Sequence, residues 1–180
     1  MIFLVNKKLK IFEITTLAIL LLVGIVSASQ ETHTLVIKGV DLDNAKKYDG
    51  AISNFNKAIG LDPQDSAAWF YKGAVLAQES KIKEADAAID HALSLNPDNS
   101  SYNVAKGLVL AMQGRNDEAE NYVDKGLVLN SNNSVGWGAK GDIAEAKGDK
   151  AGAIVDFYKA IKLNPGNIVS LKELHKLAHT

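Results

Sequence analysis

The chain has 180 residues, of which 47% are hydrophobic, and its 20 basic and 21 acidic residues leave a formal net charge of -1. This balance lacks the basic surface that nucleic-acid binding requires, and the lack of cysteine excludes disulfides, thiol catalysis and cysteine-bound metals. The hydrophobic share is ordinary for a folded protein, so the composition argues against disorder.

The N-terminal segment has the features of an export signal. Lysines up to Lys10 precede an apolar run over residues 14–26, and small residues follow it. A membrane-spanning helix needs about 20 apolar residues, and extending this run backwards would include the charged Glu13. Two interpretations remain open: residues 1–29 are a cleaved signal sequence, or they are a retained membrane anchor. Both place the rest of the chain outside the cytoplasm, because the lysines before the run stay inside.

From residue 32 onward the sequence repeats with a period of 34 residues. Glycine recurs at position 8 of the repeat, alanine at position 20, and proline at position 32 in three of the four copies. These residues are Gly39, Gly73, Gly107 and Gly141; Ala51, Ala85, Ala119 and Ala153; and Pro63, Pro97 and Pro165, with Ser131 in the remaining copy. We number the copies as repeats 1 to 4, which cover residues 32–65, 66–99, 100–133 and 134–167. A strict period of this length predicts stacked structural units.

Each repeat is predicted to form two amphipathic helices. Positions 4, 8 and 11 have the spacing of one helix face, and positions 20, 24 and 27 have the spacing of a second. The small residues at positions 8 and 20 allow the two backbones to approach closely. Turn-forming residues such as Gly114 and Gly148 separate the helices, and the proline at position 32 ends the second helix.

This pattern resembles the tetratricopeptide repeat, which has a large residue at position 4, Gly or Ala at 8, Ala at 20, an aromatic residue at 24, Ala at 27 and Pro at 32. Trp69 and Trp137 occupy position 4 of repeats 2 and 4, whereas Leu35 and Asn103 depart from the family pattern there. The resemblance implies an all-α tetratricopeptide-repeat solenoid of four helix-turn-helix repeats. It also implies a role in protein binding without catalysis.

Residues 168–180 follow the fourth repeat and are predicted to form a C-terminal capping helix. A stack of repeats needs such a cover at its end, because no repeat buries both of its faces alone. The apolar residues of this segment share one helix face and are expected to pack on repeat 4. They are Ile168, Leu171, Leu174 and Leu177.

No group of residues has the spacing of a catalytic or metal site. The four histidines lie in four different contexts, and Asp142 and Glu145 are expected to be two solvated carboxylates on one helix. The lysines at position 7 are interpreted as packing residues whose ammonium groups reach water. These lysines are Lys38, Lys72, Lys106 and Lys140. We therefore expect no enzymatic activity, no cofactor and no metal.

A second stripe on the first helix of each repeat, at positions 2, 5, 9 and 12, exceeds what packing within the repeat requires. In tetratricopeptide-repeat proteins this stripe lines a concave groove for extended or helical peptides, so the resemblance implies a partner-binding groove here. Its candidate residues are Val36, Val40, Phe70, Ala74, Val104 and Leu108. Phe70, Val104 and Leu108 are expected to be exposed; the alternative is that the stripe packs neighbouring first helices together. Acidic residues of the stripe in repeats 1 and 4 suit a partner with apolar anchors and a basic end.

The sequence therefore favours a non-catalytic protein-interaction scaffold or assembly factor outside the cytoplasm. The expected partner is a protein or peptide with apolar anchors. No nucleic acid is expected, and contact with a membrane would involve the N-terminal segment alone. The alternative is a self-associating structural module of the cell envelope, in which the uncovered first repeat stacks on another copy.

Overall fold

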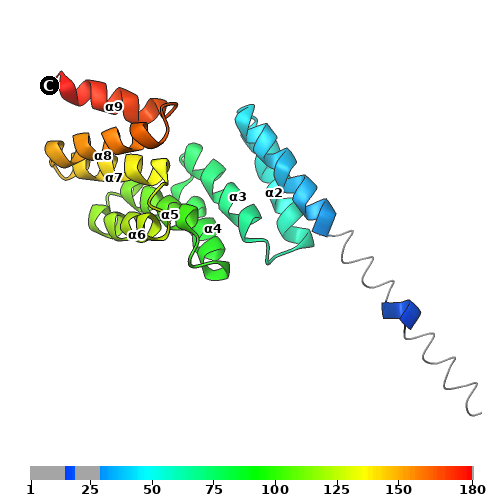
Figure 1. The fold of residues 1–180 in the computed structure, drawn as a ribbon. Coiled ribbons are helices and arrows are strands. Elements are labelled where there is room, and N and C mark those ends of the chain that lie inside the picture. Colours follow the sequence, from blue (N-terminus) through cyan, green and yellow to red (C-terminus); the bar gives the residue numbers. More distant parts are fainter. Residues whose placement is uncertain (1–14, 19–28, 180) are drawn as a thin grey trace, which may run out of the picture.

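The computed structural model describes residues 15–18 and 29–179, and the regular structure of this described part is α-helical, without β-strands. A helix covers residues 29–44 and is called helix 29–44 below. The helices that follow are α2 (Tyr48–Leu61), α3 (Ser66–Gln78), α4 (Ile82–Leu95), α5 (Ser100–Met112), α6 (Asn116–Leu129), α7 (Ser134–Ala146), α8 (Lys150–Leu163) and α9 (Ile168–Ala178). Figure 1 shows them as a curved array of helix pairs. The all-α solenoid predicted from the sequence is therefore confirmed.

The helices form an inner and an outer layer. Each first helix packs against the second helix of its own repeat, as α3 does with α4, α5 with α6, and α7 with α8. The first helices of successive repeats also contact one another: α3 contacts α5, α5 contacts α7, and α7 contacts α9. Among the described helices, α2, α4, α6 and α8 make no such contacts with one another. The first helices therefore lie on the inner, concave side of the curve.

Close packing of the two helices in each repeat depends on the glycine at position 8, as the sequence predicted. A Cβ atom on Gly73 would lie 2.7 Å from Cδ1 of Ile89, and one on Gly107 would lie 2.5 Å from Cγ2 of Val123. The large residue at position 24 thus occupies the space that a side chain at position 8 would need. The alanine at position 20 is fully buried in all four repeats.

The first helices share a capping residue that the sequence analysis missed. The last residue of each repeat accepts a hydrogen bond from a backbone N–H in the first turn of the helix that follows. Asp65 Oδ1 accepts from Ala67 N at 2.9 Å, and Asn133 Oδ1 accepts from Gly136 N at 3.0 Å. Asn99 and Asn167 cap α5 and α9 in the same way. Their spacing of 34 residues was a readable signal for the start of each first helix.

The turn between the two helices of each repeat uses a left-handed residue at position 15. Gly114 and Gly148 have φ values of 77° and 85°, as their place in the turn predicted. The same conformation is adopted by Lys46, with φ of 57°, and by Ser80, with φ of 60°. A residue with a side chain pays about 1 kcal/mol there, so repeats 1 and 2 carry backbone strain that repeats 3 and 4 avoid.

Asn103, the unusual residue at position 4 of repeat 3, replaces the hydrogen bond that tryptophan makes in the neighbouring repeats. Trp69 Nε1 donates to Pro63 O at 3.0 Å, and Trp137 Nε1 donates to Ser131 O at 2.8 Å. Asn103 Nδ2 donates to the equivalent carbonyl, Pro97 O, at 2.9 Å. Each bond ties a first helix to position 32 of the preceding repeat. The polar residue therefore preserves the junction.

One position-7 lysine differs from the expected solvated arrangement. Lys106 is 6% exposed, and its Nζ lies 2.6 Å from Asp86 Oδ1 and 2.7 Å from Asp90 Oδ1, both on α4. Burial opposes the charged form, but the hydrogen bonds that Lys106 donates to the two carboxylates keep its pKa above its usual value. In repeat 4, Lys140 Nζ similarly lies 2.6 Å from Asp124 Oδ1. These two lysines join successive repeats by ion pairs and do not simply point into water.

The face by which α9 packs also differs in part from the prediction. Leu177 and Ser170 are buried, with 8% and 1% exposure, and Leu174 is partly buried. Ile168 and Leu171, which were expected to pack on repeat 4, are 65% and 44% exposed. Asn167 caps α9 as the last residue of each earlier repeat caps the first helix that follows it. α9 therefore takes the place of a further first helix, and Leu174 and Leu177 are the residues that pack it on repeat 4.

The predicted export signal lies mostly outside the described residues, so the alternatives of cleavage and retention stay open. Within the described part, residues 15–18 are helical, and no helix there is both long and apolar enough to cross a membrane.

Candidate partner-binding groove

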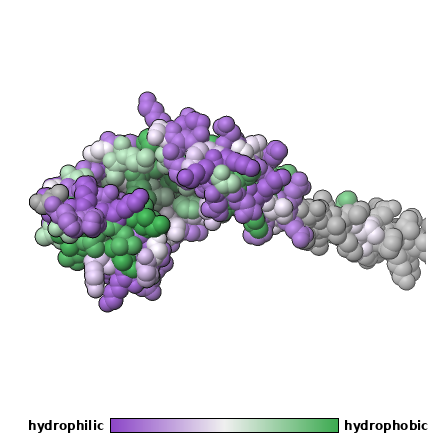
Figure 2. Space-filling model, turned by 90° about the horizontal axis from the view of Figure 1, so that it is seen from above, coloured by the Kyte–Doolittle hydropathy of each residue, from purple (hydrophilic) through white to green (hydrophobic). Residues whose placement is uncertain are grey.

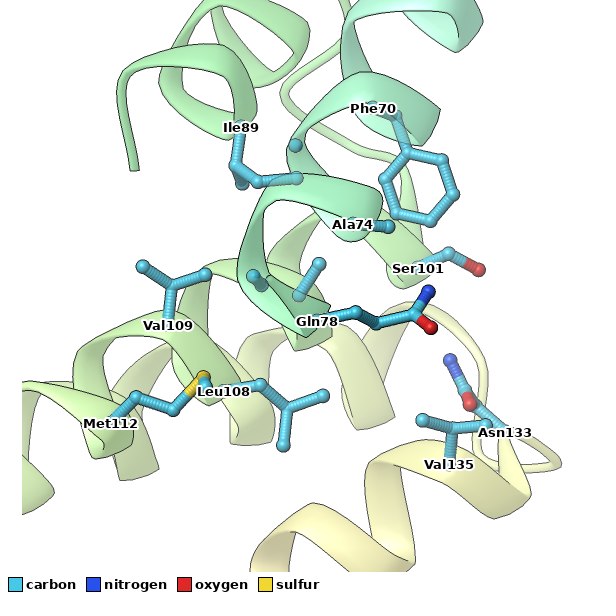
Figure 3. Close-up of a pocket in the computed structure, with 13 residues that line it drawn as sticks. Phe70, Ala74, Gln78, Ile89, Ser101, Leu108, Val109, Met112, Asn133 and Val135 are labelled. Atoms are coloured by element: carbon cyan, nitrogen blue, oxygen red, sulfur yellow. The ribbon is translucent and has the colours of Figure 1, made fainter. Parts of the chain in front are cut away.

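An apolar hollow of about 450 Å³ opens on the concave side between α3 and α5. Figure 3 shows its walls: Phe70 and Ala74 come from α3, Leu108 and Met112 from α5, and Val135 from the start of α7. In Figure 2 the surface is recessed where apolar atoms lie between the polar ends of the molecule. The hollow is called the apolar groove below.

The groove exists because small residues face one another across the first helices. Ala74 and Ala77 of α3 lie opposite Ala105 of α5, and all three line the hollow. Below them the floor is formed by the core residues Ile89 and Val109, which are 0% and 2% exposed. Larger residues at the alanine positions would fill this space, so the groove is encoded by residue size.

Phe70 forms one wall and is held in place by other aromatic rings. Its ring centroid lies 4.8 Å from that of Tyr102 in a stacked arrangement and 5.1 Å from that of Tyr71 in an edge-on arrangement. Tyr102 is fixed in turn, since its hydroxyl lies 3.2 Å from Ser66 Oγ. A rigid ring loses little side-chain entropy when a ligand covers it.

Polar side chains lie along one edge of the groove. Gln78, Ser101 and Asn133 line it, and Figure 3 shows their polar ends on the same side of the hollow. Gln78 Nε2 donates to Asp43 Oδ1 at 3.1 Å, across the junction with repeat 1. Asn133 Nδ2 donates to Ser100 Oγ at 3.1 Å. The amides are thus held by the fold, with their remaining hydrogen-bonding capacity near any bound chain.

The structure divides the six residues predicted for the groove into three groups. Phe70, Ala74 and Leu108 line the apolar groove. Val36 and Val40 line a second, smaller hollow of about 370 Å³ between helix 29–44 and α3. Val104 lines neither of these hollows.

The expectation that Val104 is exposed is wrong. Its exposure is 2%, and it belongs to the core between repeats 3 and 4. A Cβ on Gly126 would lie 2.7 Å from Cγ2 of Val104, and one on Gly136 would lie 3.1 Å from the same atom. The two glycines leave room that Val104 fills, so this side chain packs against α6 and α7 and is hidden from solvent.

The stripe of repeat 4 is covered by α9 and does not continue the groove. Gly138 is buried, and a Cβ there would lie 2.9 Å from Ser170 Oγ of α9. Glu145 Oε1 pairs with Lys176 Nζ of α9 at 2.8 Å. Burial, together with the neighbouring carboxylates of Glu173 and Glu145, raises the pKa of the Asp142 carboxyl to about 6. Neither carboxylate is therefore the freely solvated group that was expected.

The groove residues that the sequence reasoning missed include Gln78, Met112 and Asn133. Gln78 and Met112 occupy position 13, one residue beyond the predicted stripe, and Met112 is 54% exposed. Asn133 lines the groove from the turn before α7 and caps that helix. Position 13 lies eight residues after position 5, which is the spacing of the same helix face, so extending the stripe would have found the first two.

The described part of the chain has no group of three or more His, Cys, Asp or Glu side chains placed to hold a metal ion. The groove lining likewise has no titratable side chain. Its chemistry is that of an apolar surface with an amide and hydroxyl edge.

Comparisons with known proteins agree with this architecture. A family model described as tetratricopeptide repeat matches residues 44–107, and a second model of the same description matches residues 136–167. No curated protein matches the sequence.

Several solved structures share the fold at low sequence identity. PilF of Pseudomonas aeruginosa is 21% identical with a TM-score of 0.74, and the match covers 85% of this chain and 70% of PilF. PilW, described as a widely conserved type IV pilus biogenesis factor, is 20% identical with a TM-score of 0.74 over 82% of this chain and 69% of its own. A MamA protein is 17% identical with a TM-score of 0.63 over 84% and 82% of the two chains.

The family models, the 34-residue period and the paired helices lead to the same assignment. The chain belongs to the tetratricopeptide repeat family.

Proposed function

We propose that this protein is a non-catalytic interaction scaffold or assembly factor that binds an apolar segment of a partner protein in the groove between α3 and α5. The observation that carries the proposal is the apolar hollow of about 450 Å³ on the concave side. Its volume falls within the range of ordinary ligand sites. PilW, which shares the fold, is described as a biogenesis factor, and this supports a role in assembly.

The groove favours apolar anchors for a simple energetic reason. Phe70 and Leu108 are partly exposed in the free protein and lie on opposite walls. A side chain of the partner that covers them removes apolar surface from water, and full burial of one such residue is worth about 1.5–3 kcal/mol. The edge formed by Gln78, Ser101 and Asn133 can then hydrogen-bond the backbone of the bound segment.

The same lining disfavours acidic peptide tails. No Lys, Arg or His lines the apolar groove. A carboxylate placed there would lose its hydration without gaining a cationic partner, at a cost of several kcal/mol. The partner should therefore insert an uncharged, apolar side chain.

We further propose that the repeats act outside the cytoplasm, on the strength of residues 1–29. The basic start and the apolar run of that segment support export. Protease added to intact cells or spheroplasts should digest the repeats, whereas protection by an unbroken membrane would place them in the cytoplasm.

The groove is tested with three single variants of the full chain. Leu108→Asp puts a charge on the groove wall, and Phe70→Ala removes the other wall. Val128→Asp is the matched control, because Val128 is 86% exposed on α6 and lies outside the groove. Each variant is checked for helicity and then compared in capture of crosslinked partners from the host envelope. Leu108→Asp and Phe70→Ala should lose partners that Val128→Asp retains. Equal capture by all three folded variants would show that the groove is not the binding surface.

Self-association through the first repeat is the alternative function. Lys38 of helix 29–44 occupies the position at which Lys106 meets Asp86 and Asp90. At the other end of the array α9 packs on α8, so head-to-tail stacking of a second copy would bring its first repeat against α9. Sedimentation over a concentration series tests this alternative, which predicts assemblies that grow with concentration.

A further inference from the structure

We propose that the second hollow, between helix 29–44 and α3, receives a Lys or Arg side chain of the same partner segment that anchors in the apolar groove. This inference rests on the proposed function and adds a charge and a direction to the ligand. The second hollow has a volume of about 370 Å³ and shares α3 with the apolar groove. It is called the acidic hollow below.

The acidic hollow has the composition that a long cationic side chain needs. Val36, Val40 and Tyr71 give it an apolar base, and Asp41 and Asp65 add two carboxylates. Lys and Arg lay their methylene stems along apolar surface while the charged head seeks a partner. A tyrosine ring adds a favourable face for a guanidinium group.

The two carboxylates are not neutralised by the described part of the chain. Asp65 uses Oδ1 to cap α3, where it accepts from Ala67 N and Ala68 N. Among the described residues, no hydrogen bond or ion pair engages its Oδ2 atom or the Asp41 carboxylate. No Lys or Arg lines the hollow, and His33 is the one basic side chain in its described lining. The lysines of the two helices beside the hollow, Lys38 and Lys72, do not line it, and Lys72 lies over the ring of Trp69. A partner cation would therefore meet unsatisfied negative charge.

At the opposite end of the concave face the carboxylates are covered, and this gives the ligand a direction: Asp142 is partly buried, and Glu145 and Glu173 share Lys176. In repeat 4, Glu145 is paired with Lys176, and the stripe is covered by α9. The basic residue of the partner should accordingly lie towards repeat 1 and its apolar anchor towards repeat 3.

The spacing of the two hollows sets the separation of the two anchors. They lie on either side of α3, and neighbouring packed helices are about 8–10 Å apart. An extended segment covers this distance in about three residues, whereas a helix needs about five to seven. Ala67 and Ala74 are small and lie before and after Phe70 on α3, so a bound chain can cross α3 on either side of that ring.

The test uses the full chain and a set of short fluorescent peptides in a Ser–Ala background. Each peptide carries one Phe and one Arg, with separations from adjacent to about seven residues, and a second set has citrulline in place of Arg. Binding is followed by fluorescence anisotropy. Asp41→Asn and Asp65→Asn are combined to remove the two charges. Asparagine keeps the cap of α3, since Asn99 and Asn133 cap the equivalent helices.

Asp62→Asn provides a matched control in the same turn. Asp62 Oδ1 accepts from Gln64 N, and Asn130 and Asn164 make the same bond in later repeats. The substitution removes one charge outside the acidic hollow without changing the turn. It should bind both peptide sets as the wild type does.

We expect the best Phe–Arg peptide to bind the wild type about tenfold more tightly than its citrulline counterpart, and the difference to shrink at high salt. The double variant should bind both peptides equally, at the level of the citrulline peptide. Equal binding of Arg and citrulline peptides by the wild type would overturn the acidic hollow while leaving the apolar groove intact. Retained binding by Leu108→Asp would instead overturn the proposed groove, and no binding of any peptide would overturn both.

Discussion

Replacing Gly107 with alanine should destabilise the protein, although alanine is the better helix former. Gly107 lies in the middle of α5, where exchange of glycine for alanine gains about 0.5–1 kcal/mol from helix propensity alone. The new Cβ, however, would lie 2.5 Å from Cγ2 of Val123 and 2.8 Å from the backbone oxygen of Ala119. Carbon atoms at their best separation are about 3.5–4.0 Å apart, so α5 and α6 would have to move apart.

The loss can be bounded from the surroundings. Val123 is fully buried, and the Ala119 oxygen belongs to the α6 backbone, so neither atom can yield by a simple rotation into solvent. Overpacking of this kind costs about 1–3 kcal/mol. Subtracting the gain in propensity leaves about 0–2.5 kcal/mol, so Gly107→Ala should lower the free energy of unfolding by about 1 kcal/mol.

Gly60→Ala is the control for the propensity gain. Gly60 is exposed in the last turn of α2, and nothing lies within 4 Å of the position its Cβ would take. This variant should gain about 0.5 kcal/mol. Urea unfolding followed by far-UV circular dichroism measures both variants against the wild type. If Gly107→Ala were as stabilising as Gly60→Ala, close approach at position 8 would not be what holds the repeat together.

Three further substitutions test other features. Ser80→Gly relieves a left-handed backbone and should gain about 0.5–1 kcal/mol in urea unfolding, whereas Gly114→Ser, its reciprocal, should lose a similar amount. Asn103→Ala should cost about 1–2 kcal/mol, because it removes the bond to Pro97 O and leaves a cavity in a fully buried site; no loss would contradict that role. Burial under α9 raises the pKa of Asp142 from 3.8 to about 6. Between about pH 4 and 6 the native state therefore keeps a proton on this carboxyl that the unfolded state has released. The free energy of unfolding consequently falls as the pH rises through this range. Asp142→Asn should therefore gain about 1–2 kcal/mol near pH 7 and nothing near pH 4, and an equal gain at both pH values would refute burial as the cause.

The parts of the fold that could be predicted are those set inside one repeat. Gly107 must be small because Val123 of the same repeat packs against it, and this relation recurs every 34 residues. The residue pattern and the contact that explains it therefore lie within one repeat. The helix pairs and their turns followed from such relations.

The parts that could not be predicted depend on how the copies differ. Val104 occupies the same stripe position as Phe70, and a template that treats the repeats alike gives both the same exposure. Phe70 faces the alanine-lined hollow, whereas Val104 fills the room left by Gly126 and Gly136. For Lys106 a signal was present, because Asp86 and Asp90 stand at the positions of repeat 2 that meet the next lysine. Reading each position against the adjoining repeat, and not along its own column, would have predicted that ion pair.

The location of the groove follows from the same differences between copies. At repeat 4, α9 lies over the stripe and its lysine takes up the charge of Glu145. At repeat 3, burial of Val104 leaves Leu108 and Met112 as the apolar wall. The open concave surface is thereby confined to repeats 1 to 3, with apolar character between α3 and α5 and carboxylates beside helix 29–44. A ligand that binds this surface meets an apolar region at one end and carboxylates at the other. The differences between the repeats therefore give the binding surface a direction that the repeat pattern alone does not contain.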